Sequence, residues 1–197
     1  MNRRTRPHLI LASASPRRRE LLRAAGFEFE VVSPRVTEVD SEHLTLREAT
    51  SCNALRKGLA VARENPNAVV LAADTLVALG HEVIGKPRSR KEAARILRRL
   101  SGREHFVITG VCIAHFAEGR WETFSVKSTV TFKELTNAMI DDYLARVDPL
   151  DKAGAYAAQS EGRMVIARIS GSRTNVIGLP MEKTRAHLAR FGIRPSA

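Results

Sequence analysis

The chain has 197 residues, 44% of them hydrophobic and 27% charged, which is enough for one large domain or two small lobes around a buried core. This composition excludes a disordered, collagen-like or disulfide-stapled protein, and the two distant cysteines favour buried thiols in a reducing compartment. The net charge of +11 fits a polyphosphate substrate, nucleic acid or an arginine-rich source genome, and does not choose between them, because the 32 lysines and arginines are spread along the chain.

The chain begins with a basic segment, residues 1–7, and a short apolar patch at residues 9–12. This patch is shorter than the apolar core of a signal peptide, which has about 7 residues or more. The later apolar runs of the sequence fall short of the roughly 20 residues that span a bilayer. We therefore expect a cytoplasmic protein without a membrane segment, in which residues 1–7 form a basic tail and residues 8–197 a single domain.

Beyond this tail, strand-like segments alternate with helix-like ones, and the sequence has no internal repeats. In chain order we predict a strand at 8–12, a helix at 16–25, a strand at 27–33, a helix at 45–64, a strand at 68–73, a hairpin near Gly80 leading to a strand at 83–84, a helix at 89–100, strands at 106–116 and 121–132, a helix at 136–146, a loop at 148–160 with or without a short helix, a strand at 164–169 and a helix at 181–191.

Helix starts carry the clearest local signals. Ser15 is expected to cap the first helix, and Thr45 with Glu48 and Ser89 with Glu92 have the spacing of capping boxes. The middle strands are joined by hairpins and the outer ones by helices. This alternation predicts an α/β protein built around a mixed sheet.

The first candidate site lies between the first strand and the first helix, where Ser13, Ser15, Arg17 and Arg18 occur together. Free backbone N–H groups and the positive end of the helix dipole make a helix start suitable for phosphate. The alternative is a capped helix start with a solvated basic turn. Arginines in the first turn of a helix are unfavourable with the helix dipole. Their presence here therefore indicates that an anion binds at this point. The string SASPRRRELL resembles the opening motif of the Maf family.

The second candidate site follows the apolar run at 68–73, which ends in Asp74 and Thr75. Carboxylates at strand ends hold metal ions or accept protons, although aspartate also ends strands at turns. Lys86 lies in a Gly-Lys-Pro loop, where a surface lysine is the alternative. Ala-Asp-Thr and Gly-Lys-Pro both match the Maf pattern in order. The resemblance implies that Asp74 is the catalytic carboxylate and Lys86 a phosphate ligand.

Three further matches extend the resemblance over residues 11–180. ALRKGLA is similar to an Ala-x-x-Lys-Ala helix with Gly58 in place of alanine, DKAGAYAAQ to a late block of the family, and ISGSRTNVIGLP to its closing motif. The late block departs from the family after its tyrosine, at 157–160. The resemblance makes Lys57 and Lys152 phosphate ligands, Glu38 a second metal-side carboxylate and Gln159 a base-reading residue, for which its donor and acceptor are suited.

A Maf-type chain is expected to have an ITPase-like fold, with helices on both sides of a twisted sheet and a cleft between two lobes. The implied activity is hydrolysis of nucleoside triphosphates to monophosphate and pyrophosphate, and the implied assembly is a homodimer. Arg17, Thr75 and Gln159 resemble the branch that acts on dTTP and UTP. Ser13 and Ser15 belong to the expected phosphate cradle.

The chemistry expected of these residues is phosphoryl transfer, in which positioning and charge neutralisation supply most of the rate. Asp74 and Glu38 would hold a divalent cation, Mg²⁺ or Mn²⁺, because both ligands are oxygens. Asp74 would also position a water molecule for attack at the α-phosphorus and accept its proton. Arg18, Lys57 and Lys86 would neutralise the departing pyrophosphate.

Three other functions are compatible with parts of the sequence. A nucleic-acid-binding module would explain the charge, but the 5% aromatic residues do not cluster with basic ones, so nucleic acid is disfavoured. A partner-binding role in cell division is linked to the Maf family and is compatible with catalysis. A cysteine hydrolase is weakest, because Cys52 falls in a predicted helix and Cys112 in an apolar strand.

Overall fold

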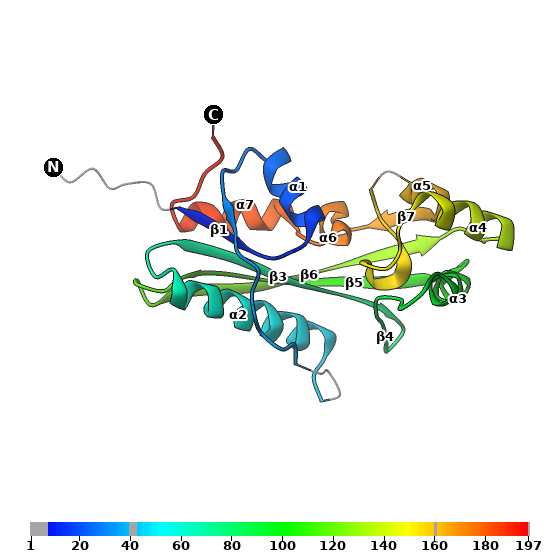
Figure 1. Ribbon diagram of the computed structural model, residues 1–197, viewed down its shortest axis with the longest axis horizontal. Helices are drawn as coiled ribbons and strands as arrows, with labels where there is room; N and C mark the ends of the chain where they lie inside the picture. Colours follow the sequence, from blue (N-terminus) through cyan, green and yellow to red (C-terminus); the bar gives the residue numbers. More distant parts are fainter. Residues whose placement is uncertain (1–7, 40–42, 160, 197) are drawn as a thin grey trace. The chain divides into compact units, whose positions relative to one another are not determined.

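The computed structural model describes residues 8–39, 43–159 and 161–196, in which seven strands form one mixed sheet (Figure 1). The strands are β1 (Leu9–Ala12), β2 (Glu30–Val31), β3 (Val69–Leu79), β4 (Glu82–Ile84), β5 (Glu104–His115), β6 (Arg120–Phe132) and β7 (Ile166–Ser170). Their order is β2-β1-β3-β5-β6-β7, with β4 paired to β3. β1 is parallel to β2 and β3, whereas β4 and β7 are antiparallel to their partners. The mixed sheet predicted from the sequence is confirmed.

The helices, in chain order, are α1 (Pro16–Ala24), α2 (Leu46–Glu64), α3 (Arg90–Leu100), α4 (Asn137–Arg146), the 3-10 turn η1 (Ala153–Ala155), α5 (Gly162–Val165), α6 (Arg173–Ile177) and α7 (Met181–Arg190). None of the helices in the described part of the chain is long and apolar enough to cross a membrane. The residues fall into two compact units, one made of Met1–Asp74, Thr109–Val126 and Gly178–Ala197, the other of Thr75–Ile108 and Lys127–Ile177. The predicted single domain after a basic tail stays a prediction, because residues 1–7 lie outside the described residues.

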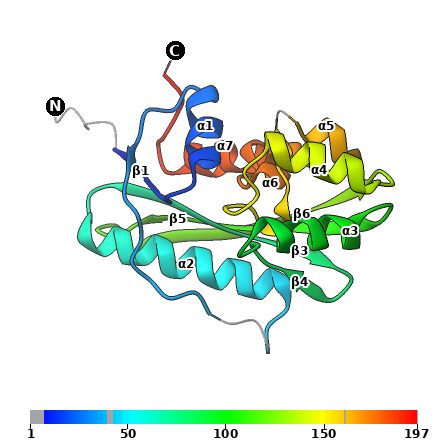
Figure 2. The ribbon, with the colours of Figure 1, turned by 45° about the vertical axis from the view of Figure 1, so that its right-hand side comes forward.

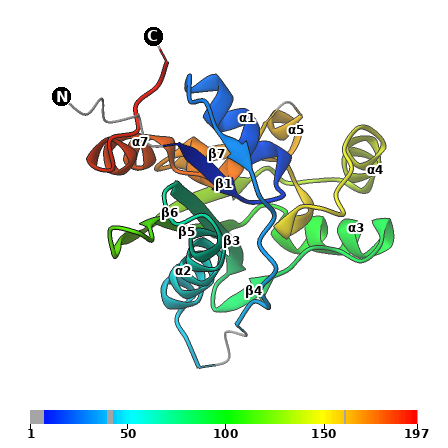
Figure 3. The same ribbon diagram turned by 60° about the vertical axis from the view of Figure 1, so that its left-hand side comes forward.

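In the first unit, helices cover both faces of the sheet (Figures 1 and 3). Successive residues of β3 point to opposite faces, as a strand requires. Val69 and Leu71 pack in a core with residues of α1 and α7, whereas Val70 and Ala72 pack against α2. Because both faces are buried, this part of β3 reads as a continuous apolar run rather than an alternating one. Helices on both sides of the sheet are thus confirmed for this unit.

Two glycines allow α2 to lie close to the sheet. A Cβ atom at Gly110 of β5 would come 2.4 Å from the backbone carbonyl of Thr50, and one at Gly58 of α2 would come 2.9 Å from the Cys112 Sγ. Both distances are shorter than real Cβ atoms show, so a larger residue at either position would force a neighbour to move, and at Gly110 that neighbour is backbone. The close approach to β5 fixes the height of α2, which carries site residues, above the sheet.

In the second unit, helices and strands pack around one hydrophobic core. α3 contacts α4 and η1, and α4 contacts α5 (Figure 2). The largest fully buried side chains of this core include Leu97, Leu100, His105, Ile140 and Tyr143. The core therefore contains a histidine and a buried phenol among its aliphatic residues.

Most predicted elements are present within a few residues, and the differences have local causes. The strand predicted at 27–33 shrinks to Glu30–Val31, since only Ile10 and Leu11 of β1 pair with it. The strand predicted from 164 begins at Ile166, because the Met164 amide donates to the Glu161 carbonyl in the turn of α5. Helix α6 was not predicted.

Two other corrections concern residues near the predicted site. β3 continues to Leu79, so Asp74 lies within a strand rather than at its carboxyl end. Ser15 precedes α1 as expected, but its side chain makes no capping hydrogen bond. The capping box of Thr45 and Glu48 is complete. At Ser89 only half of the box forms, because the Glu92 carboxylate accepts from the Arg88 amide instead.

Candidate active site

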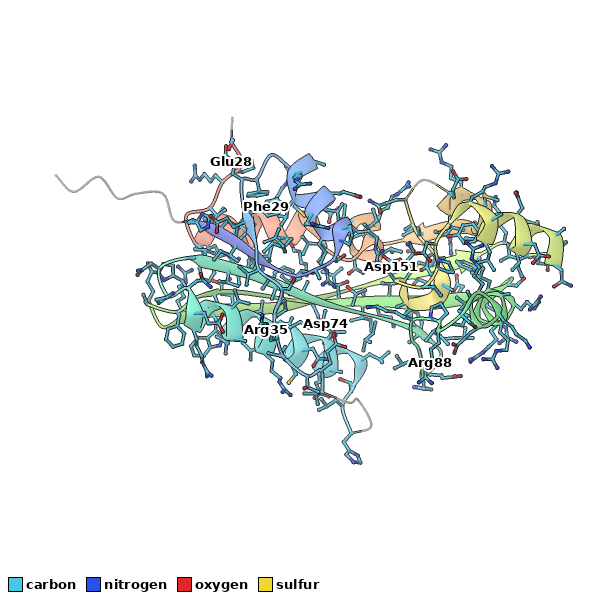
Figure 4. The ribbon with its side chains drawn as sticks, viewed as in Figure 1. Glu28, Phe29, Arg35, Asp74, Arg88 and Asp151 are labelled. Atoms are coloured by element: carbon cyan, nitrogen blue, oxygen red, sulfur yellow. The ribbon has the colours of Figure 1, made fainter. Side chains whose placement is uncertain are left out.

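The first unit brings two carboxylates to the same ammonium group. The Lys57 Nζ lies 2.6 Å from the Asp74 Oδ1 and 2.6 Å from the Glu38 Oε1. The Asp74 side chain is 8% exposed and Lys57 13%, whereas Glu38 is 61% exposed. Figure 4 shows Asp74 beside α2, the helix that carries Lys57. This arrangement joins a buried carboxylate to an accessible one through a single positive charge.

Asn53 is a fourth member of this cluster, and sequence reasoning missed it. Its Nδ2 lies 3.4 Å from the Asp74 Oδ2, and its Oδ1 accepts a 2.8 Å hydrogen bond from the Val39 amide. Asn53 and Lys57 are four residues apart on α2 and therefore lie on one helical face. The four-residue spacing from Lys57 is the signal that the sequence offers. In the structure Asn53 is buried, and a buried amide needs polar partners.

Arg18 connects three segments of the first unit. Its Nη1 donates to the Ser13 Oγ at 3.1 Å and to the Ala73 carbonyl at 2.8 Å, and its Nε donates to the Gly178 carbonyl at 2.8 Å. Burial lowers the pKa of Arg18 to about 10, which the charge of Asp74 opposes. The guanidinium is therefore still charged at neutral pH. One of its acceptors immediately precedes Asp74 in the chain.

The other residues of the opening motif surround this arginine. The Ser15 amide donates to the Ser13 Oγ at 3.2 Å, so the buried Ser13 hydroxyl interacts with both Ser15 and Arg18. Arg17 is half-buried in the first turn of α1, next to Arg18. Ser13 and Arg18 are thus brought together, and the binding of a phosphate at this point stays a prediction.

In the second unit, the Gly-Lys-Pro loop contacts the late motif block. The Gly154 amide donates to the Gly85 carbonyl at 3.2 Å, which places the exposed Lys86 on a loop beside the segment that carries Lys152. The Lys152 Nζ interacts with the Asp151 carboxylate, which is labelled in Figure 4, and with the Asp148 carbonyl at 2.7 Å. A phosphate at Lys152 would therefore compete with an acidic neighbour.

The three predicted specificity residues belong to different segments. Arg17 lies in the first unit, and Thr75 and Gln159 lie in the second. All three are half-buried. The Gln159 carbonyl accepts from the Gly162 amide at 2.8 Å, so its backbone is fixed while its side-chain role stays a prediction.

Both cysteines lie within regular elements of the first unit. Cys112 is fully buried in β5, and burial raises the pKa of its thiol to about 12. A thiol with this pKa stays protonated at neutral pH, and the thiolate is the reactive form. Cys52 lies half-buried within α2. These positions agree with structural roles.

Comparisons with known proteins identify the family. The family described as Maf-like protein matches residues 8–191. A dTTP/UTP pyrophosphatase of Bacillus pumilus is 44% identical over 187 residues, covering 95% of this chain and 98% of that protein. One of Myxococcus xanthus is 45% identical over 185 residues, covering 94% and 93%. The Staphylococcus aureus Ham1 structure covers 93% of this chain and 99% of its own, with a TM-score of 0.55 and 16% identity, a likeness of fold alone that supports the expected ITPase-like architecture. This chain belongs to the Maf family.

Proposed function

We propose that this protein hydrolyses dTTP and UTP to the nucleoside monophosphate and pyrophosphate. Membership of the Maf family and the names of the relatives support the reaction. The observation that carries the proposal is the bridge from Lys57 to Asp74 and Glu38, with 2.6 Å on each side. A buried carboxylate next to a fixed positive charge suits a reaction in which water attacks a phosphate.

Asp74 is the proposed proton acceptor. The water oxygen bonds to the α-phosphorus, the bond from this phosphorus to the bridging oxygen breaks, and pyrophosphate leaves with the bonding electrons. The proton of the attacking water passes to the Asp74 carboxylate. The contacts of Asp74 with Lys57 and Asn53 support this role, because they orient both carboxylate oxygens before the substrate arrives.

Positive side chains would neutralise the charge of the triphosphate. We assign this role to Lys57 and Arg18 of the first unit, where Ser13 and Ser15 would be the hydroxyl donors of a phosphate cradle. Within the second unit we assign it to Lys86 and Lys152. Lys57 is largely buried and is fixed in place by Asp74 and Glu38, and a phosphate would have to share its ammonium with these two carboxylates. Fixed charges of this kind stabilise developing negative charge without having to reorganise.

A divalent cation, Mg²⁺ or Mn²⁺, fits the donor set. The Asp74 Oδ1 and the Glu38 Oε1 both contact the Lys57 ammonium, so a cation would bind through the remaining lone pairs of these carboxylates rather than at the position of the ammonium. Among the described residues, no group of three or more histidine, cysteine, aspartate and glutamate side chains converges as a metal site. Proteins usually bind Mg²⁺ through one or two carboxylates, and substrate phosphates and water supply the other ligands. When bound, the ion would supply further charge neutralisation at the phosphate oxygens.

Arg17, Thr75 and Gln159 are the proposed selectors of the uracil or thymine base. The Gln159 amide has one donor and one acceptor group, as the imide edge of these bases requires. The same reading makes the protein a cytoplasmic homodimer. A role in cell division is compatible with this activity. If that role is separate from hydrolysis, a catalytically dead variant should retain it.

A nucleotide panel with Mg²⁺ or Mn²⁺ tests this proposal. We expect dTTP and UTP to be preferred over CTP and purine triphosphates, with UMP and pyrophosphate as products rather than UDP and phosphate. Asp74→Asn should lower kcat at least about 1000-fold with an unchanged circular dichroism spectrum. Asp141→Asn on the exposed side of α4 removes the same charge and should keep full activity. An active Asp74→Asn variant, or a preference for purines, would refute the assignment.

A further inference from the structure

Three aromatic rings meet in the core of the second unit. His105, Phe132 and Tyr156 lie edge to face, with ring centroids 4.9 to 5.3 Å apart. His105 is fully buried, and its Nε2 lies 2.9 Å from the Tyr156 hydroxyl. Its Nδ1 has no hydrogen-bond partner among the described residues. Among the described residues, the polar contact of this buried imidazole is therefore the one with Tyr156.

Tyr156 belongs to an irregular segment that carries two of the proposed substrate contacts. Residues 152–159 begin with Lys152 and end with Gln159. Gly154 has a φ of +76° and Ala155 a φ of +61°. An alanine in the left-handed region is strained and persists only where the surroundings hold it.

The segment is held by contacts spaced along its length. The Gly154 amide donates to the Gly85 carbonyl, the Ala157 amide to the Tyr143 hydroxyl at 2.9 Å, and the Arg173 guanidinium to the Ala158 carbonyl at 3.0 Å. The ring of Tyr156 also packs against Gly154, where a Cβ atom would lie 3.0 Å from its Cε1. The Tyr156 ring thus lies directly against the strained turn.

The hydrogen bond of Tyr156 differs from the other contacts because both partners are buried side chains. Van der Waals packing of three rings fixes their separation, whereas a hydrogen bond also fixes direction and depth. Breaking it would leave a buried polar atom on His105 without its partner, which is costly. The conformation of the turn is therefore coupled to this one bond.

We propose that His105 and Tyr156 are positioning residues whose hydrogen bond holds residues 152–159 in the conformation that presents Lys152 and Gln159 to the nucleotide. Neither residue touches the substrate in this proposal. It rests on the proposed function for the identity of the nucleotide, and on contacts within the second unit for the mechanism.

Tyr156→Phe tests the proposal because it removes the hydroxyl and keeps the ring. We expect KM for UTP to rise about 10-fold with kcat changed less than about 2-fold, and the preference for UTP over CTP to fall by a similar factor. Hydrogen exchange of the amides at 152–159 should become about 10-fold faster, while the amides of α2 keep their rates.

Two companion variants separate positioning from general destabilisation. Ser101→Ala removes the 2.7 Å hydrogen bond that the Leu135 amide donates to the Ser101 hydroxyl, which joins two residues of the same unit outside 152–159, and should leave KM and base preference unchanged. The double variant His105→Phe with Tyr156→Phe replaces both polar partners by apolar groups and should recover stability. Its KM and selectivity should remain impaired, because the directional bond is still absent. It also serves if Tyr156→Phe alone does not fold.

Each outcome decides the question. Unchanged KM, selectivity and exchange in a folded Tyr156→Phe or double variant would overturn the proposal, and so would equal effects in Ser101→Ala. If the wild-type protein hydrolysed no pyrimidine triphosphate, the proposed function would fail, but the exchange measurement would still report whether the bond holds the segment.

Discussion

The Asp74 cluster of the first unit and the 152–159 segment of the second are held in place by different means. Asp74 lies within strand β3, and its partners Asn53 and Lys57 lie on helix α2, so regular hydrogen bonding and close packing fix the site. The second segment has two consecutive left-handed residues and depends on side-chain hydrogen bonds. The difference indicates that the proposed reaction chemistry sits on regular elements and the proposed recognition on an irregular segment.

The two regions also differ in how their lysines are neutralised. Lys57 is shared by two acidic side chains, 19 residues before it and 17 after it in the chain. Lys152 interacts with Asp151, its neighbour in sequence. An ion pair between residues on separate elements stabilises their relative position, whereas a pair between neighbours constrains only the local chain. Lys57 is therefore structural as well as electrostatic.

Removing the shared charge of the first unit should have the largest effect. In Lys57→Met the stem is retained, but Asp74 and Glu38 lose the ammonium between them. We expect kcat/KM for UTP to fall about 1000-fold, or about 4 kcal/mol of transition-state stabilisation. Steady-state kinetics with Mg²⁺ would measure it.

The matched control is Lys183→Met, on the exposed surface of α7, which changes the net charge equally and should stay within about 2-fold of wild type. If both variants lost activity alike, the general positive charge of the protein would explain the effect. The claim that Lys57 acts through its contacts with Asp74 and Glu38 would then be wrong.

The same contrast explains what could be predicted from the sequence. The apolar run before Asp74 and the capping box at Thr45 are local patterns. The helix formed where expected, and the strand is present but continues to Leu79, beyond the end of the apolar run. The binding of phosphate by Arg18 stays a prediction. Besides the Ser13 hydroxyl, its guanidinium contacts the carbonyls of Ala73 and Gly178, and backbone acceptors of this kind leave no mark in a sequence. The turn at Ala155 was missed for a related reason, since its left-handed φ results from tertiary contacts rather than from its own residue type.

The second unit should respond to acid through His105. Burial lowers the pKa of this histidine to about 4, from 6.5 in an exposed chain. Between these values the unfolded chain binds a proton that the folded protein does not, so the free energy of unfolding should decrease as the pH falls from about 6.5 to 4. The loss should reach about 3 kcal/mol. Urea unfolding across this range would measure it.

His105→Gln removes the titrating group and should flatten the curve between pH 4 and 6.5. Two carboxyl groups also have lowered pKa values. Hydrogen bonds from Thr45 lower the pKa of Glu48. At Glu122 burial raises the pKa, but the hydrogen bond with His187 contributes to a net lowering. The stability that these two carboxylates contribute is lost only as the pH falls below the ordinary carboxyl pKa of 4.5. This loss therefore occurs at a lower pH than most of the loss due to His105. A wild-type curve parallel to that of His105→Gln above pH 4.5 would contradict the assignment to His105.

The smallest effect tests how closely α2 must lie to the sheet in the first unit. Gly58→Ala gains about 1 kcal/mol of helix propensity but places a methyl group 2.9 Å from the Cys112 Sγ, and such overpacking costs about 1–3 kcal/mol. We expect a net destabilisation of about 1 kcal/mol in urea unfolding. Cys112→Ala removes the sulfur, so the double variant should be more stable than the sum of the single changes by about 1 kcal/mol. Additive effects would mean that α2 shifts outward to accept the methyl group, and the Lys57 contact with Asp74 would then weaken along with it.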